Sequence, residues 1–275
     1  MKTIKNILLF LMGWAMMGII RGRELSVVRY KIHTGKTNGK IRLVLLSDLH
    51  SNSYGRGQKK LIRAIEAVNP DLILMAGDIA DHIIPHANTK ILLRKLGDYP
   101  CFYVSGNHEF KSGEVREIKH FFRELGADVL EGECRKVNVR GNKINICGVD
   151  DAVIGAEKFK KQLLNCAREA DSRNYTILLT HRPEKINLYE KLNFNLILTG
   201  HTHGGQIRLP HVPSAANGIY AVHQGFKPKY AGGIYNIGES FDNYMVVSRG
   251  LSKSTRGIPR IFNRPELVVI DVCGG

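Results

Sequence analysis

The 275-residue sequence has little cysteine, a single tryptophan and a shortage of acidic residues. Its five cysteines are odd in number and show no Cys-x-x-Cys spacing, which argues against a disulfide framework and against a thiolate zinc site. Free thiols fit a reducing compartment. The sequence also lacks internal repeats, low-complexity tracts and blocks of like charge. We therefore expect one large domain with a short N-terminal appendage.

The shortage of acidic residues leaves a strongly basic chain. With 40 Lys and Arg against 25 Asp and Glu, the formal net charge is +15. Such a charge favours anionic partners, namely phosphate esters, nucleic acid or an acidic membrane surface. The basic residues form no stripe interleaved with aromatic residues, which would be typical of nucleic-acid binding. We therefore do not expect a nucleic-acid partner.

The N-terminal segment is the most apolar part of the chain. Residues 7–20 carry no charge and are flanked by two lysines on one side and two arginines on the other. This run is short for a spanning helix of about 20 residues, and no Ala-x-Ala-like cleavage site follows it. We expect residues 1–24 to be an uncleaved hydrophobic anchor, with the main domain at 41–272. By the positive-inside rule the domain is cytoplasmic, and a cleaved export signal is the alternative.

From residue 41 onward, short apolar runs alternate with amphipathic stretches, which is typical of a layered α/β fold. Strands are expected at 41–47, 72–76, 102–105, 143–149, 176–180, 196–199, 244–248 and 267–271. Helices are expected at 58–68, 86–96, 113–125, 156–170 and 184–191. Beyond residue 206 the helical period is lost, and the chain is rich in Gly, Pro and Tyr before two closing strands.

Polar residues follow several of these strands at the point where each strand ends. The first strand closes on Asp48 and His50, and later ones close on Gly-Asp, Gly-Asn-His-Glu, His and Gly-His-Thr-His. The carboxyl ends of strands in α/β sheets line the crevice where ligands bind, so these clusters should converge. Side chains two apart in a strand point the same way, which predicts that Asp48 and His50 share one face.

The residue types in these clusters indicate a metal site. Imidazole nitrogens with carboxylate and amide oxygens, and no thiolate, suit Mn, Fe, Zn or Ni in the divalent state. The seven candidate ligands exceed one tetrahedral site, so we expect two divalent metal ions. Asp78, next to Gly77, is the best candidate for a carboxylate shared by both ions. The candidates are Asp48, His50, Asp78, Asn107, His181, His201 and His203.

The ordered set of motifs over 41–203 resembles the calcineurin-like metallophosphoesterases. The motifs are Asp48-Leu-His50, Gly77-Asp78-Ile-Ala-Asp81, Gly106-Asn107-His108-Glu109, His181 and Gly200-His201-Thr-His203. The resemblance implies a four-layer αββα sandwich, two mixed sheets flanked by helices, with the metals at the sheet edges. It also implies that Asp48, His50 and His203 hold one metal, that Asn107, His181 and His201 hold the other, and that Asp78 bridges them.

The same resemblance implies a hydrolase of phosphodiester, phosphomonoester or pyrophosphate bonds, with attack by a metal-bridging hydroxide. His108 is the expected acid and Asp81 its orienting partner. Arg182, beside His181, is a candidate to bind the substrate phosphate. Two alternatives remain open, namely a nuclease or soluble phosphodiesterase, and a non-catalytic scaffold of the same fold. The scaffold is less favoured because every motif position is filled.

The C-terminal part of the sequence narrows the resemblance. Residues 200–210 and 248–272 look like a bacterial branch of membrane-anchored or exported phosphoesterases, which includes YkuE-like and YaeI-like proteins and UDP-2,3-diacylglucosamine pyrophosphatases. That branch usually has Gly-x-Gly where this chain has Ser252 at the second position. The resemblance and the N-terminal segment together favour a membrane-associated enzyme with a lipid-linked substrate.

Overall fold

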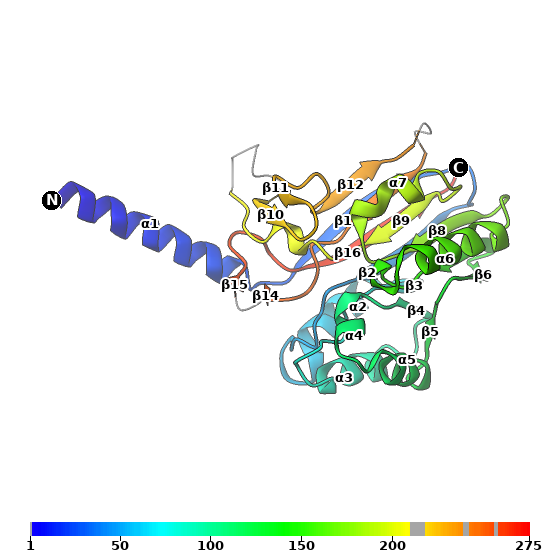
Figure 1. Ribbon diagram of the computed structural model, residues 1–275, viewed down its shortest axis with the longest axis horizontal. Helices are drawn as coiled ribbons and strands as arrows, with labels where there is room; N and C mark the ends of the chain where they lie inside the picture. The colour runs from blue at the N-terminus through cyan, green and yellow to red at the C-terminus, as the bar shows by residue number, and fades with distance from the viewer. Residues whose placement is uncertain (1, 210–217, 239–241, 256–257) are drawn as a thin grey trace.

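The computed structural model describes residues 2–209, 218–238, 242–255 and 258–275, and it contains two six-stranded sheets (Figure 1). The first sheet has, in spatial order, β1 (Ser26–His33), β16 (Glu266–Cys273), β2 (Lys40–Leu46), β3 (Leu72–Ala76), β4 (Cys101–Val104) and β5 (Ala127–Val129). The second has β12 (Gly233–Asn236), β13 (Tyr244–Val247), β9 (Leu196–Thr199), β8 (Tyr175–Leu179), β7 (Asn142–Gly148) and β6 (Glu133–Val139). The expected α/β class with two mixed sheets is confirmed.

Both sheets are mixed, and each has a parallel centre. In the first sheet β2 to β5 run parallel, while β16 pairs antiparallel with β2. In the second, β7, β8, β9 and β13 run parallel, and β6 and β12 are antiparallel strands at its two edges. Parallel strands all end on the same side of their sheet, so the loops that follow their carboxyl ends lie close together there.

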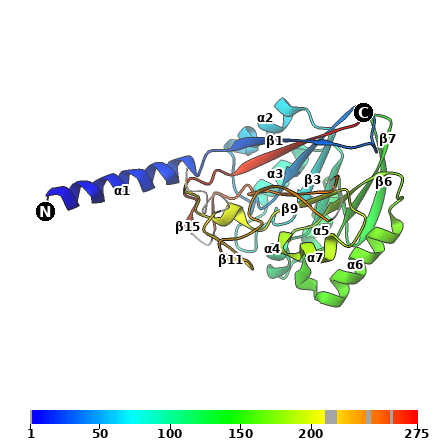
Figure 2. The same cartoon turned by 90° about the horizontal axis from the view of Figure 1, so that it is seen from above.

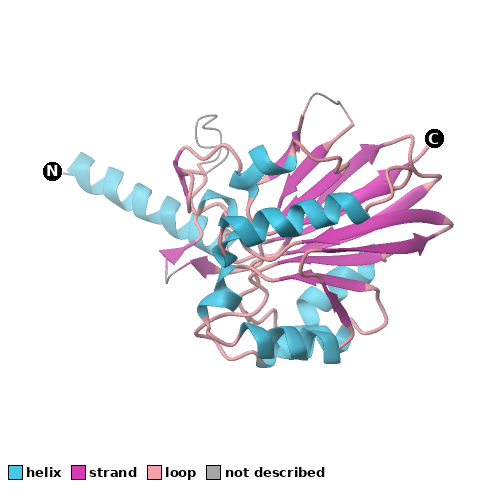
Figure 3. Ribbon diagram, turned by 45° about the vertical axis from the view of Figure 1, so that its right-hand side comes forward, coloured by secondary structure: helices cyan, strands magenta, loops and turns pink. Residues whose placement is uncertain are grey.

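Burial on both faces explains why the strands read as continuous apolar runs. In β2, Leu43 and Leu45 belong to the core between the sheets, whereas Val44 and Leu46 belong to the core under the helices. The helices α2 (Lys59–Val68), α3 (Ala87–Lys95) and α5 (Val115–Glu124) cover the outer face of the first sheet. The helices α6 (Ala156–Glu169) and α7 (Ile186–Tyr189) cover the second, and Figure 3 shows these layers.

The strands that sequence analysis did not anticipate lie mostly at or next to the sheet edges. In β1 and β6, partly buried residues alternate with exposed ones and many are charged, so neither strand has the apolar run of a central strand. β1 pairs along its whole length with β16, which brings residues ahead of 41 into the first sheet. The helix expected at 184–191 is a 3₁₀ turn at Pro183–Lys185 followed by α7. All five cysteines are free, as expected.

The N-terminal segment forms α1 (Lys2–Arg21), which projects from the domain in Figures 1 and 2. Its C-terminal half packs on a loop near the end of the chain, where the Trp14 and Phe262 ring centroids are 4.5 Å apart and the Phe262 amide donates to Gly18 O. Its exposed apolar residues are Ile7, Leu9, Phe10, Met12, Met16, Met17 and Ile20. Among the described residues, no helix has the length and apolar character needed to span a membrane.

Candidate metal centre

The structure brings the predicted ligands together at one edge of both sheets, in two buried groups. The first group is Asp48, His50 and His203, and the second group is Asp78, His181 and His201. Within each group, one ligand atom per residue lies within 4.8 Å of the others. The loops after β2, β3, β8 and β9 supply these residues, so strand ends far apart in sequence converge as expected.

Asp78 belongs to the second group and also faces the first. Its Oδ2 is 3.2 Å from His181 Nε2 in the second group and 3.7 Å from His50 Nε2 in the first. Across the first group, His203 Nε2 is 3.6 Å from Asp48 Oδ1. One carboxylate therefore faces ligand atoms of both groups, which is the arrangement that a shared ligand requires.

Three buried ligand atoms have no hydrogen-bond partner among the described residues, namely His50 Nε2, Asn107 Oδ1 and His201 Nε2. Burying a polar atom without a partner is costly. A divalent cation bound by nitrogen and oxygen would provide the missing partner, so the donor set fits the expected metals. The orientation of His181 is also that of a metal ligand. Its Nδ1 donates a hydrogen bond to Ala76 O at 2.7 Å, which leaves the lone pair on Nε2, the atom that faces Asp78.

Left-handed backbone turns aim most of these side chains. Asp48, His50, Asp78, His201 and His203 have φ values of 49, 49, 53, 71 and 48°. Non-glycine residues rarely adopt this region, and such strain is concentrated at functional sites. Asp48 and His50 do point to one side, as expected, but β2 ends at Leu46, so strand alternation is not the reason. Instead the turn is held by backbone bonds, with the Asp48 amide donating to Gly77 O and the His50 amide to Asp78 O.

Two glycines permit close approach of the backbone to the carboxylates. A Cβ at Gly106 would lie 2.3 Å from Asp78 Oδ1, and one at Gly200 would lie 2.4 Å from Asp48 Oδ2. Both distances are far below van der Waals contact, so any side chain there would displace a predicted ligand.

His108 lies beside the two groups, in the short helix α4 (Asn107–Lys111). Its Nδ1 is 3.1 Å from Asp81 Oδ2, the partner that the resemblance implied. The same oxygen is 2.9 Å from His50 Nδ1, so Asp81 also contacts a predicted metal ligand. His82 Nδ1 lies 2.9 Å from His108 Nδ1, a contact that sequence analysis did not anticipate.

Glu109 ties the loops of the site together. Its carboxylate accepts hydrogen bonds from the backbone amides of Asp78, Ala80 and Gly106, at 3.0, 3.0 and 2.9 Å. Burial raises the pKa of Glu109 to about 8. Through these hydrogen bonds both carboxylate oxygens of Glu109 join the loop after β3 to the loop after β4.

The electrostatics of the site differ between its imidazoles: burial opposes the charged form of His181, but Asp78 outweighs burial and raises the pKa of that ring well above its usual value. Burial lowers the pKa of His201 and of His203 well below the usual value, so both rings are neutral and offer a lone pair. Burial raises the pKa of Asp48. Burial also opposes ionisation of Asp78, but the neighbouring His181 outweighs it and holds the pKa of that carboxyl well below its usual range.

Two buried side chains behind the site were not found from the sequence. The single N–H of Arg182 Nε is shared between the two carboxylate oxygens of Asp151, at 2.8 and 3.0 Å, so the candidate phosphate-binding arginine is held by a carboxylate. Ser252 Oγ lies 2.8 Å from His203 Nδ1 and accepts a hydrogen bond from Arg260 Nη2 at 3.1 Å. In the sequence, the only indication of the contact between Ser252 and His203 is that a serine stands where related sequences usually have glycine.

Comparison with known proteins agrees with this geometry. A family model described as calcineurin-like phosphoesterase matches residues 41–205. A putative metallophosphoesterase of Caenorhabditis elegans, F40B5.2, is 31% identical over 92% of this chain and 52% of its own length. The uncharacterized metallophosphoesterase YkuE of Bacillus subtilis is 31% identical over 83% of this chain and 77% of its own. The chain spans little more than half the length of several of the curated relatives that it matches, F40B5.2 among them.

Among solved structures, the Haemophilus influenzae NAD nucleotidase NadN superposes with a TM-score of 0.53. The match covers 77% of this chain and 45% of that one, at 17% sequence identity. At this identity the likeness concerns the fold alone.

Proposed function

The chain belongs to the calcineurin-like phosphoesterase family, and on that premise we propose that it is a two-metal hydrolase of phosphoric ester or diphosphate bonds. The observation that carries the proposal is the pair of adjoining buried Asp and His groups, with the Asp78 carboxylate facing histidines of both. When bound there, two divalent cations offset the charge of a phosphate group and lower the pKa of water. Mn, Fe, Zn and Ni all suit the donor set.

We assign the predicted ligands to two cations according to the two groups in which their side chains lie. Asp48, His50 and His203 would hold one cation, His181 and His201 would hold the other, and Asp78 would be shared. Asn107 completes the second group, since its buried Oδ1 has no other described partner. The seven ligands follow five separate strands, β2, β3, β4, β8 and β9, so the site depends on the whole fold.

His108 would donate a proton to the departing oxygen of the substrate. Burial opposes its charged form, but the hydrogen bond to Asp81 outweighs burial and raises the pKa of His108. Its side chain is 23% exposed, so a substrate can reach it. Asp81 orients the ring, and Arg182 beside the second group contributes positive charge toward the substrate phosphate.

The substrate we propose is a membrane-proximal, lipid-linked phosphoester such as a UDP-diacylglucosamine-like molecule. Support comes from α1, whose apolar side chains are exposed, and from the net charge of +15, which favours an anionic surface. In this proposal α1 associates with the membrane and the domain lies on its cytoplasmic face, because basic residues are more numerous after the apolar run than before it.

The activity is tested with the purified full chain, loaded with Mn²⁺, on a panel of phosphomonoesters, phosphodiesters and nucleotide-linked lipids. His108→Ala should keep its metal content and lose about 10²–10⁴-fold in turnover, because a general acid contributes that much. Asp78→Ala should lose metal and activity together. His120→Ala, on the exposed face of α5, is the matched control and should behave as wild type.

Hydrolysis of no compound on the panel by metal-loaded wild type would refute the proposed function. Full turnover by His108→Ala on substrates with poor leaving groups would refute the assignment of the acid while leaving the metal site standing.

A further inference from the structure

A small hairpin beside the metal site exposes two aromatic side chains. Its strands are β10 (Tyr220–Ala221) and β11 (Gly225–Phe226), paired antiparallel. The rings of Tyr220 and Phe226 lie edge to face with centroids 5.4 Å apart, yet 47% of Tyr220 and 77% of Phe226 is exposed. A folded protein gains little from an exposed aromatic pair, so such a pair commonly marks an interaction surface.

The same hairpin is attached to the metal centre. The ring of His223, in its turn, stacks on that of His201 with centroids 5.3 Å apart and an interplanar angle of 15°. At its base, the Ile219 amide donates to Gly205 O at 3.1 Å, just after the last predicted ligand. One side of the hairpin therefore touches the site while the aromatic pair faces solvent.

Other exposed apolar groups lie on the same side of the molecule. Figures 1 and 2 both place the hairpin and β15 (Ile258–Pro259) at the end of the domain from which α1 projects. Ile258 is 55% exposed, and α1 carries its own row of exposed apolar residues. Three segments far apart in sequence thus present apolar side chains at one end.

Positive charge accompanies these apolar groups. Lys227 and Lys229 follow the hairpin directly and are exposed, as are Arg21 and Arg23 at the end of α1. Exposed apolar side chains among cations match an anionic bilayer, in which apolar groups enter the acyl region and cations meet the headgroups. A second copy of this chain would bring like charges together, so charge disfavours that occupant.

We propose that the β10–β11 hairpin is a second membrane contact, separate from α1, which docks the metal centre against an anionic lipid surface. It rests on the proposed function and deepens it, because a site docked in this way receives esters whose apolar part stays in the bilayer. Phe226 and Tyr220 insert, and the lysines that follow hold the headgroups.

The test uses the full chain and vesicles of phosphatidylcholine with or without phosphatidylglycerol, titrated through half-binding. Phe226→Ser should weaken partitioning about tenfold, the loss expected for one apolar side chain, and Phe226→Leu should restore it. Lys227→Ala should weaken binding roughly fivefold, and only to vesicles that contain phosphatidylglycerol. Phe226 is mostly exposed, so folding should not change.

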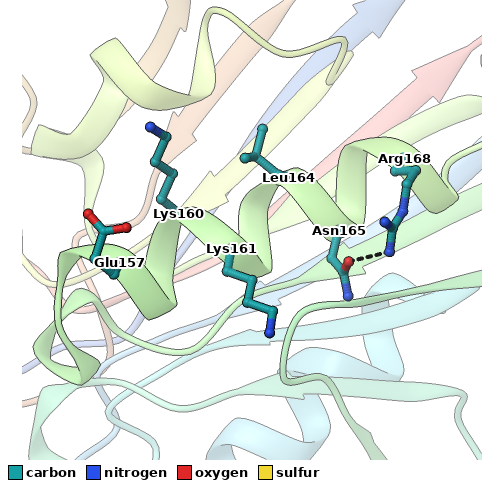
Figure 4. Close-up of a pocket in the computed structure, with 6 residues that line it drawn as sticks. All are labelled: Glu157, Lys160, Lys161, Leu164, Asn165 and Arg168. Carbon is teal, nitrogen blue, oxygen red and sulfur yellow. Dashed lines mark hydrogen bonds between the residues drawn. The ribbon is translucent and has the colours of Figure 1, made fainter.

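Leu164→Ser is the matched control. Leu164 is 50% exposed and lines a shallow hollow of about 450 Å³ on α6, at the opposite end of the domain from α1 (Figure 4). The Leu164→Ser variant should bind vesicles as tightly as wild type does. Phe226→Ser should also hydrolyse the soluble substrate bis(p-nitrophenyl) phosphate at the wild-type rate.

Vesicle binding by Phe226→Ser equal to wild type would overturn the inference, whatever the activity. A shift of Phe226→Ser from dimer to monomer without loss of vesicle binding would also overturn it, in favour of self-association. If wild type hydrolyses no phosphoester, the proposed function fails instead, and vesicle binding still decides whether the hairpin contacts membrane.

Discussion

Replacing Ser252 by alanine tests whether the surroundings of the metal centre control its affinity. Ser252 is fully buried, and its Oγ lies 2.8 Å from His203 Nδ1. His203 Nε2 faces Asp48 in the first group, so a cation there requires the ring proton on Nδ1. Ser252 accepts that proton in a hydrogen bond and fixes both the tautomer and the ring orientation.

The size of the effect follows from what the substitution removes. Losing the partner of a metal-ligating histidine typically lowers metal affinity 10–100-fold. Leaving the buried Nδ1–H without an acceptor costs about 1–3 kcal/mol, which is about 5–150-fold in a binding constant. Both routes predict that Ser252→Ala weakens one of the two sites by about fivefold or more.

The assay is calorimetric titration of metal-free full-length protein with Mn²⁺. Wild type should show two binding sites, and Ser252→Ala should weaken one and leave the other unchanged. Ser26→Ala, which removes a serine bond to the carbonyl of Pro265, is the control and should bind as wild type. If both sites of Ser252→Ala keep the wild-type affinity, the hydrogen bond does not position His203 and the reasoning is refuted.

Two further predictions concern stability and close packing. Lys119 is 7% exposed and ion-paired with the equally buried Asp150, so Lys119→Met should destabilise the fold by about 3–5 kcal/mol in urea unfolding. Arg173→Met, which breaks a pair whose arginine is 87% exposed, should leave the midpoint unchanged, and equal losses would contradict the argument. Gly106→Ala should lose bound metal, measured by elemental analysis after dialysis, because its Cβ displaces the shared carboxylate. Gly97→Ala, whose Cβ meets only ordinary contacts, should retain it.

The central strands were predictable because burial on both faces leaves an unambiguous apolar run. β3 and β9 have the predicted bounds, Leu72–Ala76 and Leu196–Thr199. β1 and β6 were not predicted because a half-exposed strand has mixed residues, and only its pairing with a neighbour defines it. Strand pairing between residues more than 200 positions apart leaves no local signal.

The convergence of polar strand ends was predictable for a similar reason, since parallel strands share an edge. The way each side chain is aimed was not, because Asp48 and His50 depend on left-handed turns that no sequence period reports. Contacts from distant segments, such as Ser252 with His203 and Asp151 with Arg182, join loops that follow neighbouring strands of the second sheet, so they depend on which strands pair. These contacts are fixed by tertiary packing, which a single sequence does not display.

The proposed activity requires two metal ions, one on either side of Asp78. The most direct measurement is anomalous X-ray scattering from crystals of the full chain grown with Mn²⁺. We expect two peaks about 3.5–4 Å apart, one next to His203 and one next to His201, with Asp78 between them. A single peak, or peaks remote from Asp78, would contradict this.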